Sequence, residues 1–134
     1  MKKNKKILTK AEEQIMHYLW KIEKGFVKDI IEQFPEPKPA YTTVTTIIRI
    51  LVKKGFIGYH QYGKTNEYYP LVSKSIYLDN HLREIVKKYF NGSVTKFASF
   101  FAQDDNLSIS DLEEINKLID KQIKKRKTNN LNTN

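Results

Sequence analysis

Three prolines at alternate positions, in the segment Pro35-Glu36-Pro37-Lys38-Pro39, constrain the fold of this chain more than any other feature. Proline fixes its own φ, lacks a backbone N–H donor and pushes the preceding residue towards an extended conformation. The segment therefore excludes a helix and an inner strand, and it predicts a stiff connector. Each side of this connector must form its own secondary structure.

Two helices are predicted before the connector. Thr9-Lys10-Ala11-Glu12 has the pattern of a capping box, and Gly25 stops the helix that begins there. A second, shorter helix is predicted over residues 27–34. Apolar residues recur at helical spacing in both segments. They are Ala11, Ile15, Tyr18, Leu19 and Ile22 in the first helix, and Val27, Ile30, Ile31 and Phe34 in the second.

A third helix is predicted over residues 41–54, with Gly55 as its C-cap. Its apolar side is formed by Val44, Ile47, Ile48 and Leu51. The opposite face carries Thr42, Thr45, Thr46, Arg49 and Lys53. Because β-branched residues are mediocre helix formers, helix stability does not explain the threonines. They indicate a functional demand on this face.

A β-hairpin is predicted after the third helix. Residues 56–62 and 67–72 are rich in β-branched and aromatic side chains, and Gly63-Lys64-Thr65-Asn66 between them has turn composition. Three helices followed by a hairpin form a winged helix-turn-helix, in which the third helix enters the DNA major groove and the hairpin tip lies along the backbone. The sequence predicts such a DNA-binding domain over residues 1–72.

From Ser73 onwards the pattern is helical, so the predicted fold class is mainly α with one small hairpin. Three helices are predicted over 73–90, 93–101 and 108–127, and residues 128–134 are predicted to form a disordered tail. The first has an apolar stripe of Leu78, Leu82, Ile85, Val86, Tyr89 and Phe90. The inward positions of the second are Val94, Phe97, Ala98 and Phe101.

Three helices of this length cannot easily bury their apolar stripes among themselves. A second copy of the chain could cover the remainder, so residues 73–127 are predicted to form a helical dimerisation domain. The side chains predicted to lie in the subunit interface are Phe97, Phe101, Leu112, Ile115, Ile119 and Ile123.

The formal charge of +9 indicates a polyanionic partner. Residues 1–70 hold 13 Lys and Arg against 7 Asp and Glu, whereas residues 71–134 hold 11 against 8. Nucleic acid and an anionic membrane surface are the general candidates. The start of the chain lacks the apolar stretch of a signal peptide, and no run is long enough to span a membrane. We therefore expect a cytoplasmic protein that is not inserted in a membrane.

Catalysis, metals and cofactors are not expected. The chain has no cysteine, which excludes disulfides, thiolate metal sites and cysteine nucleophiles. His17, His60 and His81 fall on three different predicted elements, without a nearby nucleophile or carboxylate motif. The adjacent Asp104 and Asp105 suit the start of a helix better than a metal site. The sequence therefore offers no convergent polar site that would indicate an enzyme.

The strongest local signal for double-stranded DNA is the polar face of the third helix. Threonine hydroxyls can donate to phosphates or bases, threonine methyls suit thymine methyls, and Arg49 can bind guanine O6 and N7 together. Lys53 and the hairpin residue Lys64 add positive charge. The alternatives are a merely solvated face, or a winged-helix adaptor that contacts a protein without reading DNA.

Two further basic segments have ordinary explanations as well as functional ones. The arm containing Lys2, Lys3, Lys5 and Lys6 could reach a neighbouring groove, or could simply keep the chain soluble. The lysines of 121–127 stand at the predicted C-terminus of a helix, where they complement the dipole and need no ligand.

An ordered series of segments resembles the penicillinase and methicillin-resistance repressor family of winged-helix transcriptional repressors. The similarity extends over residues 7–125. The segments that carry it are Leu8-Thr9-Lys10-Ala11-Glu12-Glu13-Gln14-Ile15-Met16, Leu19-Trp20, Thr43-Val44 with Thr46, Leu51-Val52-Lys53-Lys54-Gly55-Phe56-Ile57, and Tyr68-Tyr69-Pro70-Leu71-Val72.

The resemblance implies a homodimer that binds a palindromic operator and silences an antibiotic-response or metal-response operon. It also implies inactivation when a membrane sensor-protease triggers cleavage in the C-terminal half. The recognition residues that it implies are Thr42, Thr45, Thr46 and Arg49, with Lys64 in the wing.

The chain departs from the family pattern at two places. Where family members commonly have an arginine just before Leu51, this chain has Ile50, and Arg49 stands one step earlier, a rotation of about 100° around the helix. The family's Asn-Phe cleavage point falls on Phe100-Phe101, so its asparagine is missing. The copper-responsive branch uses C-terminal cysteines, which are absent here.

Overall fold

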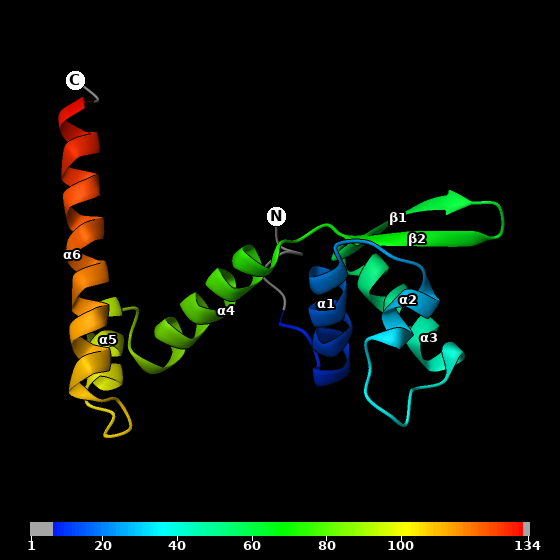
Figure 1. The fold of residues 1–134 in the computed structure, drawn as a ribbon, viewed down its shortest axis with the longest axis horizontal. Coiled ribbons are helices and arrows are strands. Elements are labelled where there is room, and N and C mark those ends of the chain that lie inside the picture. The colour runs from blue at the N-terminus through cyan, green and yellow to red at the C-terminus, as the bar shows by residue number, and fades with distance from the viewer. Residues whose placement is uncertain (1–6, 133–134) are drawn as a thin grey trace. The chain divides into compact units, whose positions relative to one another are not determined.

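The computed structural model describes residues 7–132, and it confirms the predicted fold class (Figure 1). Six helices and a two-stranded antiparallel sheet occur in the described part of the chain. In chain order the elements are α1 (Lys10–Ile22), α2 (Val27–Glu32), α3 (Tyr41–Lys53), β1 (Ile57–Tyr62), β2 (Thr65–Pro70), α4 (Lys74–Tyr89), α5 (Val94–Ala102) and α6 (Ile109–Asn132).

The chain forms two compact units that divide between Ile85 and Val86, within α4. In the first unit, α1, α2 and α3 pack beside the hairpin around one core (Figure 1). The side chains that are almost completely buried there are Ile15, Met16, Leu19, Ile30, Val44, Ile48, Leu51, Phe56, Ile57 and Val72. Ala11, which belongs to the predicted apolar spacing of α1, is exposed, whereas Met16, which that spacing omitted, takes a core position.

The hairpin turn is tighter than predicted. Tyr62 pairs with Thr65, so the loop contains only Gly63 and Lys64. Gly63 has φ of +61°, which glycine adopts without steric cost and which permits a two-residue turn. The expected four-residue turn was therefore wrong, and Thr65 and Asn66 belong to β2. As a result, Lys64 lies at the extreme tip of the hairpin.

Gly25 joins α1 and α2 to the hairpin. Its N–H donates to the carbonyl of Tyr68 at 2.9 Å, and the N–H of Tyr68 donates to the carbonyl of Gly25 at 2.8 Å. A Cβ at residue 25 would stand only 2.8 Å from Cδ1 of Ile22. A glycine therefore fits the narrow space in which residue 25 pairs with Tyr68 of β2.

A partly buried ion pair joins α1 to the end of α3. Lys54 Nζ lies 2.7 Å from Glu12 Oε1, with the glutamate side chain 7% and the lysine side chain 26% exposed. The Glu12 carboxylate also accepts from the backbone N–H of Thr9, whose hydroxyl accepts from the N–H of Glu12. The predicted capping box is thus present, and its carboxylate additionally anchors the helix that carries the threonine face.

Burial by itself would raise the pKa of Glu12, but its hydrogen bonds have the larger combined effect. The bonds from Lys54 and Thr9 and the positive charge of Lys54 lower the pKa of this carboxyl below its ordinary value. Glu12 is consequently ionised in the folded protein at neutral pH.

The first half of α4 belongs to the N-terminal unit because Tyr77 is anchored on α1. Tyr77 is 2% exposed; its hydroxyl accepts from the N–H of Leu8 at 3.2 Å and donates to Glu13 Oε2 at 3.1 Å. Trp20 Nε1 donates to the carbonyl of Val72 at 2.9 Å. The compact unit therefore continues to Ile85, whereas the sequence placed the boundary after residue 72.

The predicted apolar stripe of α4 was partly wrong. Leu78 is 51% exposed, and Leu82 and Tyr89 are exposed as well. Val86 is buried as predicted, and Tyr77, which the predicted stripe omitted, is buried as well. Periodicity identified the helix, but contacts with distant segments determine which side of it faces the core.

The C-terminal unit leaves most of its apolar side chains exposed. Phe90 packs edge-on against Phe97 at a ring separation of 5.6 Å, but α5 has no fully buried residue. Val94, Ala98 and Phe101, which were predicted to face inward, are exposed. The predicted end of the last helix was also wrong: α6 continues to Asn132, so most of the expected disordered tail is helical.

We predict that Lys54→Met lowers the free energy of unfolding by about 1.5–3 kcal/mol, because it leaves the buried Glu12 carboxylate without its charged partner. Urea denaturation would measure the change. Lys21→Met, at an exposed position of α1, should stay within about 0.5 kcal/mol of the parent chain. Equal stability of the two variants would contradict the role of the ion pair.

The lowered pKa of Glu12 predicts a pH dependence of stability. A carboxyl whose pKa falls on folding stabilises the protein above its unfolded pKa, near 4.5, and this contribution disappears as the pH falls through the folded value. The parent chain should therefore be more stable than Glu12→Gln at pH 7. Denaturation from pH 7 to pH 3 should show this advantage shrinking below about pH 4.5; a constant difference would count against it.

Candidate nucleic-acid interface

The helix α3 has a fully buried side and an exposed side. Val44, Ile48 and Leu51 are buried in the core. The residues predicted to read DNA lie on the other side, where Thr42, Thr46, Arg49 and Lys53 are exposed and Thr45 is half-buried. The core thus fixes which side of the helix meets solvent.

The sequence predicts that the threonine hydroxyls donate to phosphates or bases, but those of Thr45 and Thr46 are not free donors. Thr45 Oγ1 donates to the carbonyl of Tyr41, and Thr46 Oγ1 donates to the carbonyl of Thr42, each at 2.8 Å. Each hydroxyl proton is thereby engaged within the helix. What remains available on each side chain is a methyl group and an oxygen lone pair that can accept a hydrogen bond.

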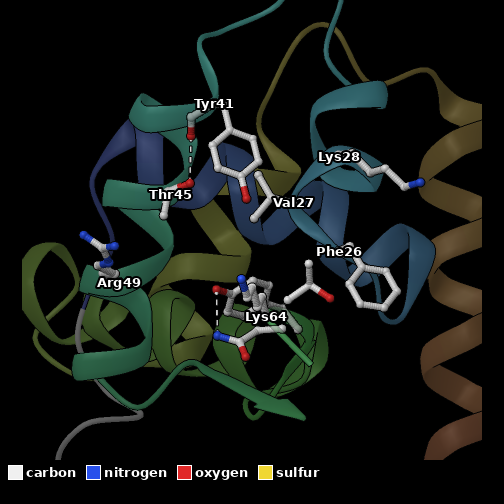
Figure 2. Close-up of a pocket in the computed structure, with 10 residues that line it drawn as sticks. Phe26, Val27, Lys28, Tyr41, Thr45, Arg49 and Lys64 are labelled. Atoms are coloured by element: carbon white, nitrogen blue, oxygen red, sulfur yellow. Dashed lines mark hydrogen bonds between the residues drawn. The ribbon is translucent and has the colours of Figure 1, made fainter. Parts of the chain in front are cut away.

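A hollow of about 610 Å³ separates one edge of α3 from the hairpin and the start of α2. Figure 2 shows Tyr41, Thr45 and Arg49 following one another along α3, with Lys64 below them and Val27 and Phe26 on the α2 side. The remaining lining residues are Lys28, Thr65, Asn66 and Tyr68.

The hollow is positively charged. Lys28, Arg49 and Lys64 contribute cations, and none of its lining residues is an aspartate or glutamate. Within the described residues, the ion pairs involve other cations: Lys38, Lys54 and Arg83. A concave, cationic surface with a few hydroxyl and amide groups suits the phosphates of a nucleic-acid backbone.

The structure brings together only some of the predicted residues. Thr45, Arg49 and Lys64 meet at the hollow, although they come from α3 and the hairpin tip. Thr42, Thr46 and Lys53 lie on the exposed face of α3 without lining it. The basic arm of Lys2, Lys3, Lys5 and Lys6 lies outside the described residues.

Tyr41 and Lys28 line the hollow, although the sequence did not predict a role for either. Tyr41 is the first residue of α3, and the N-terminal residues of a recognition helix are the ones that contact base edges, so its position could have signalled it. Lys28 gave no such signal. It reaches the hollow because α2 is held to the hairpin by the Gly25–Tyr68 pairing.

The residues predicted for the subunit interface all lie on α5 and α6. Phe97, Leu112 and Ile115 are half-buried, whereas Phe101, Ile119 and Ile123 are exposed. Ile115 and Ile119 also line a shallow groove on α6. The predicted cleavage point, Phe100-Phe101, lies inside α5, and Phe100 is 70% exposed.

The other features considered for chemistry do not converge in the described part of the chain. His17, His60 and His81 lie on separate elements, where they contact the rings of Trp20, Tyr69 and Tyr77 respectively. Across residues 7–132, no three His, Asp or Glu residues are grouped closely enough to hold a metal ion. No helix described there has the length and apolar character needed to cross a membrane.

Two solved structures resemble part of this chain. The solution structure of the DNA-binding domain of the repressor BlaI aligns with a TM-score of 0.46 and 24% identity, covering 52% of this chain and 85% of that one. The CopR repressor structure aligns with a TM-score of 0.42 and 29% identity, covering 51% of this chain and 100% of that one.

Two relatives match over most of their length. The penicillinase repressor of Bacillus licheniformis is 23% identical over 121 residues, covering 90% of this chain and 94% of that protein. The methicillin resistance regulatory protein MecI of Staphylococcus aureus is 27% identical over 116 residues, covering 86% and 94%. The profile of the penicillinase repressor family matches residues 8–121. The chain therefore belongs to the penicillinase repressor family.

Proposed function

We propose that this protein is a transcriptional repressor that binds double-stranded DNA sequence-specifically, as a homodimer on a palindromic operator. The observation that carries the proposal is the exposed threonine and arginine face of α3 next to the cationic hollow. Membership of a family whose relatives are named as repressors supports it. The protein would act in the cytoplasm, with the winged helix-turn-helix of the N-terminal unit binding DNA and the helices of the C-terminal unit, from Val86 onwards, forming the dimer.

In this proposal, α3 enters the major groove and Arg49 contacts a guanine through O6 and N7. Thr42, Thr45 and Thr46 contribute lone pairs and methyl groups, because two of their hydroxyl protons are engaged within the helix. Lys53 and Lys64 neutralise backbone phosphates, which fix the register of the protein on the duplex. Lys28 and Tyr41 contribute to the same surface from opposite sides of the hollow.

Dimer formation would cover the apolar side chains that the C-terminal unit leaves exposed. Phe101, Ile119 and Ile123 retain substantial exposure in the single chain. Intertwined obligate dimers usually bury about 2,000 Å² or more, which requires apolar surface of this kind. Two recognition helices would then meet half-sites separated by about 34 Å or a multiple of it.

Relief of repression is proposed to follow a sensor-protease pathway, as the family resemblance implies. The bond between Phe100 and Phe101 lies within α5, in a unit with little buried surface. Segments with few buried contacts open locally at low cost, so α5 is a suitable place for cleavage. The asparagine of the family's cleavage point is absent, so the bond that is cut must be determined by mass spectrometry of the induced protein.

We predict that Arg49→Ala weakens binding to the operator by about 1–3 kcal/mol and relaxes sequence preference, since it removes a base contact. Lys64→Ala should weaken binding to all sequences equally and reduce the slope of log K against log salt by about 0.9. Gel shifts with DNA flanking the protein's own gene, at several salt concentrations, would measure both effects.

Lys21→Ala is a matched control, because Lys21 is exposed on α1 and does not line the hollow. It should leave the sequence preference and the salt slope unchanged. Weak retention of every duplex by the parent chain, regardless of sequence, would contradict the proposal and favour an adaptor that contacts a protein.

For the dimer, we predict that the double substitution Ile115→Asp with Ile119→Asp yields monomers that bind a half-site weakly. Two carboxylates within the proposed interface would lose hydration without gaining partners. Sedimentation over a range of concentrations would reveal the change in mass. Lys117→Asp, about 160° away from both positions around α6, serves as the control; a double variant that still sediments as a dimer would refute the interface.

A further inference from the structure

The exposed side of α3 includes an aliphatic side chain, Ile50, that the proposed function leaves unused. Ile50 is 41% exposed and is not part of the hydrophobic core. Isoleucine offers no hydrogen-bond donor or acceptor, so it can contact neither a phosphate nor the polar edge of a base productively. In contact with a ligand, it can therefore make a favourable contact only with an apolar group.

Thr46 stands one helical turn before Ile50, so their side chains are neighbours on the surface of α3. The hydroxyl of Thr46 donates to the carbonyl of Thr42 at 2.8 Å, which leaves the methyl group as its apolar part available for contact. Together, Thr46 and Ile50 form an apolar edge of the helix. An adjacent edge, formed by Tyr41, Thr45 and Arg49, faces the cationic hollow (Figure 2).

Among the groups that base pairs present in the major groove, the apolar one is the C5-methyl group of thymine. We propose that Thr46 and Ile50 bind thymine C5-methyl groups, and that the operator half-site has a thymine where this apolar edge meets the groove. This inference rests on the proposed function, because it requires α3 to lie in the major groove. It makes Ile50 a specificity-determining residue of this chain.

The two edges of α3 would then read different chemistry. Arg49 favours a guanine. Ile50 favours a base that presents an apolar group in the major groove, and it cannot accept a hydrogen bond from the amino group of a cytosine. An uncompensated polar group costs binding energy, so the isoleucine also discriminates against alternatives.

The test begins with a duplex that the parent protein selects from a random-sequence pool. Each thymine of that duplex is replaced singly by deoxyuridine, which removes the methyl group and preserves base pairing. Burying one methyl group contributes roughly a threefold to fivefold change in affinity. The parent protein should lose about this factor at one or two thymines of each half-site, measured by fluorescence anisotropy.

Variants of Ile50 and of Thr46 show which side chain makes the protein sensitive to removal of the thymine methyl group. Ile50→Ala, at an exposed position where alanine favours the helix, should bind the thymine duplex more weakly than the parent protein does, and should be less sensitive to the replacement because only the Thr46 methyl contact remains. Thr46→Val keeps the methyl group and should retain discrimination, whereas Thr46→Ser loses the methyl group and should lose part of it. Circular dichroism would establish that each variant is folded.

The outcomes separate this inference from the function on which it rests. A pool that yields no preferred sequence would overturn both. A preferred sequence at which no thymine is sensitive to methyl removal would overturn the methyl contact alone, as would equal sensitivity in the parent protein and in Ile50→Ala.

Discussion

The ion pair between Glu12 and Lys54 fixes α3 relative to α1, and so fixes which side of α3 is exposed. It connects the first turn of α1 to the residue that ends α3, at a separation of 2.7 Å. The carboxylate is also the second half of the capping box that begins α1. One side chain thus stabilises the start of one helix and fixes the end of another. The orientation of α3, and with it the choice of exposed residues, depends on this junction and on the core beneath it.

The exposed surfaces of the two units differ in chemistry. Tyr41, Thr45 and Arg49 face a hollow that Lys28 and Lys64 make cationic, and Thr46 with Ile50 forms an apolar edge. The C-terminal unit has the opposite character, since most of its aromatic and aliphatic side chains are exposed in the single chain. In the proposed function, the polar surface of α3 contacts DNA and the exposed apolar surface of the C-terminal unit forms the dimer.

Local patterns predicted the elements well, and contacts between distant segments account for what they missed. The capping box, the prolines and the periodicity of α3 gave the N-terminal helices and the exposed face of α3. The burial of Tyr77 depends on Leu8 and Glu13, more than sixty residues earlier, so periodicity within α4 could not reveal it. Lys28 likewise reaches the hollow through the pairing of Gly25 with Tyr68. The continuation of α6 to Asn132 was missed because residues 128–134 are polar and lack apolar periodicity, although no glycine or proline there stops a helix.

The hydrogen bonds from Thr45 and Thr46 to the carbonyls one turn earlier have a thermodynamic consequence. A β-branched side chain already has few χ1 rotamers in a helix, and an internal bond selects one of them before any ligand arrives. Long flexible side chains such as lysine lose considerable conformational entropy when a complex immobilises them. Threonines held in this way lose little, so this face is preorganised. In the proposed complex, more of its contact energy would remain available to distinguish one base sequence from another.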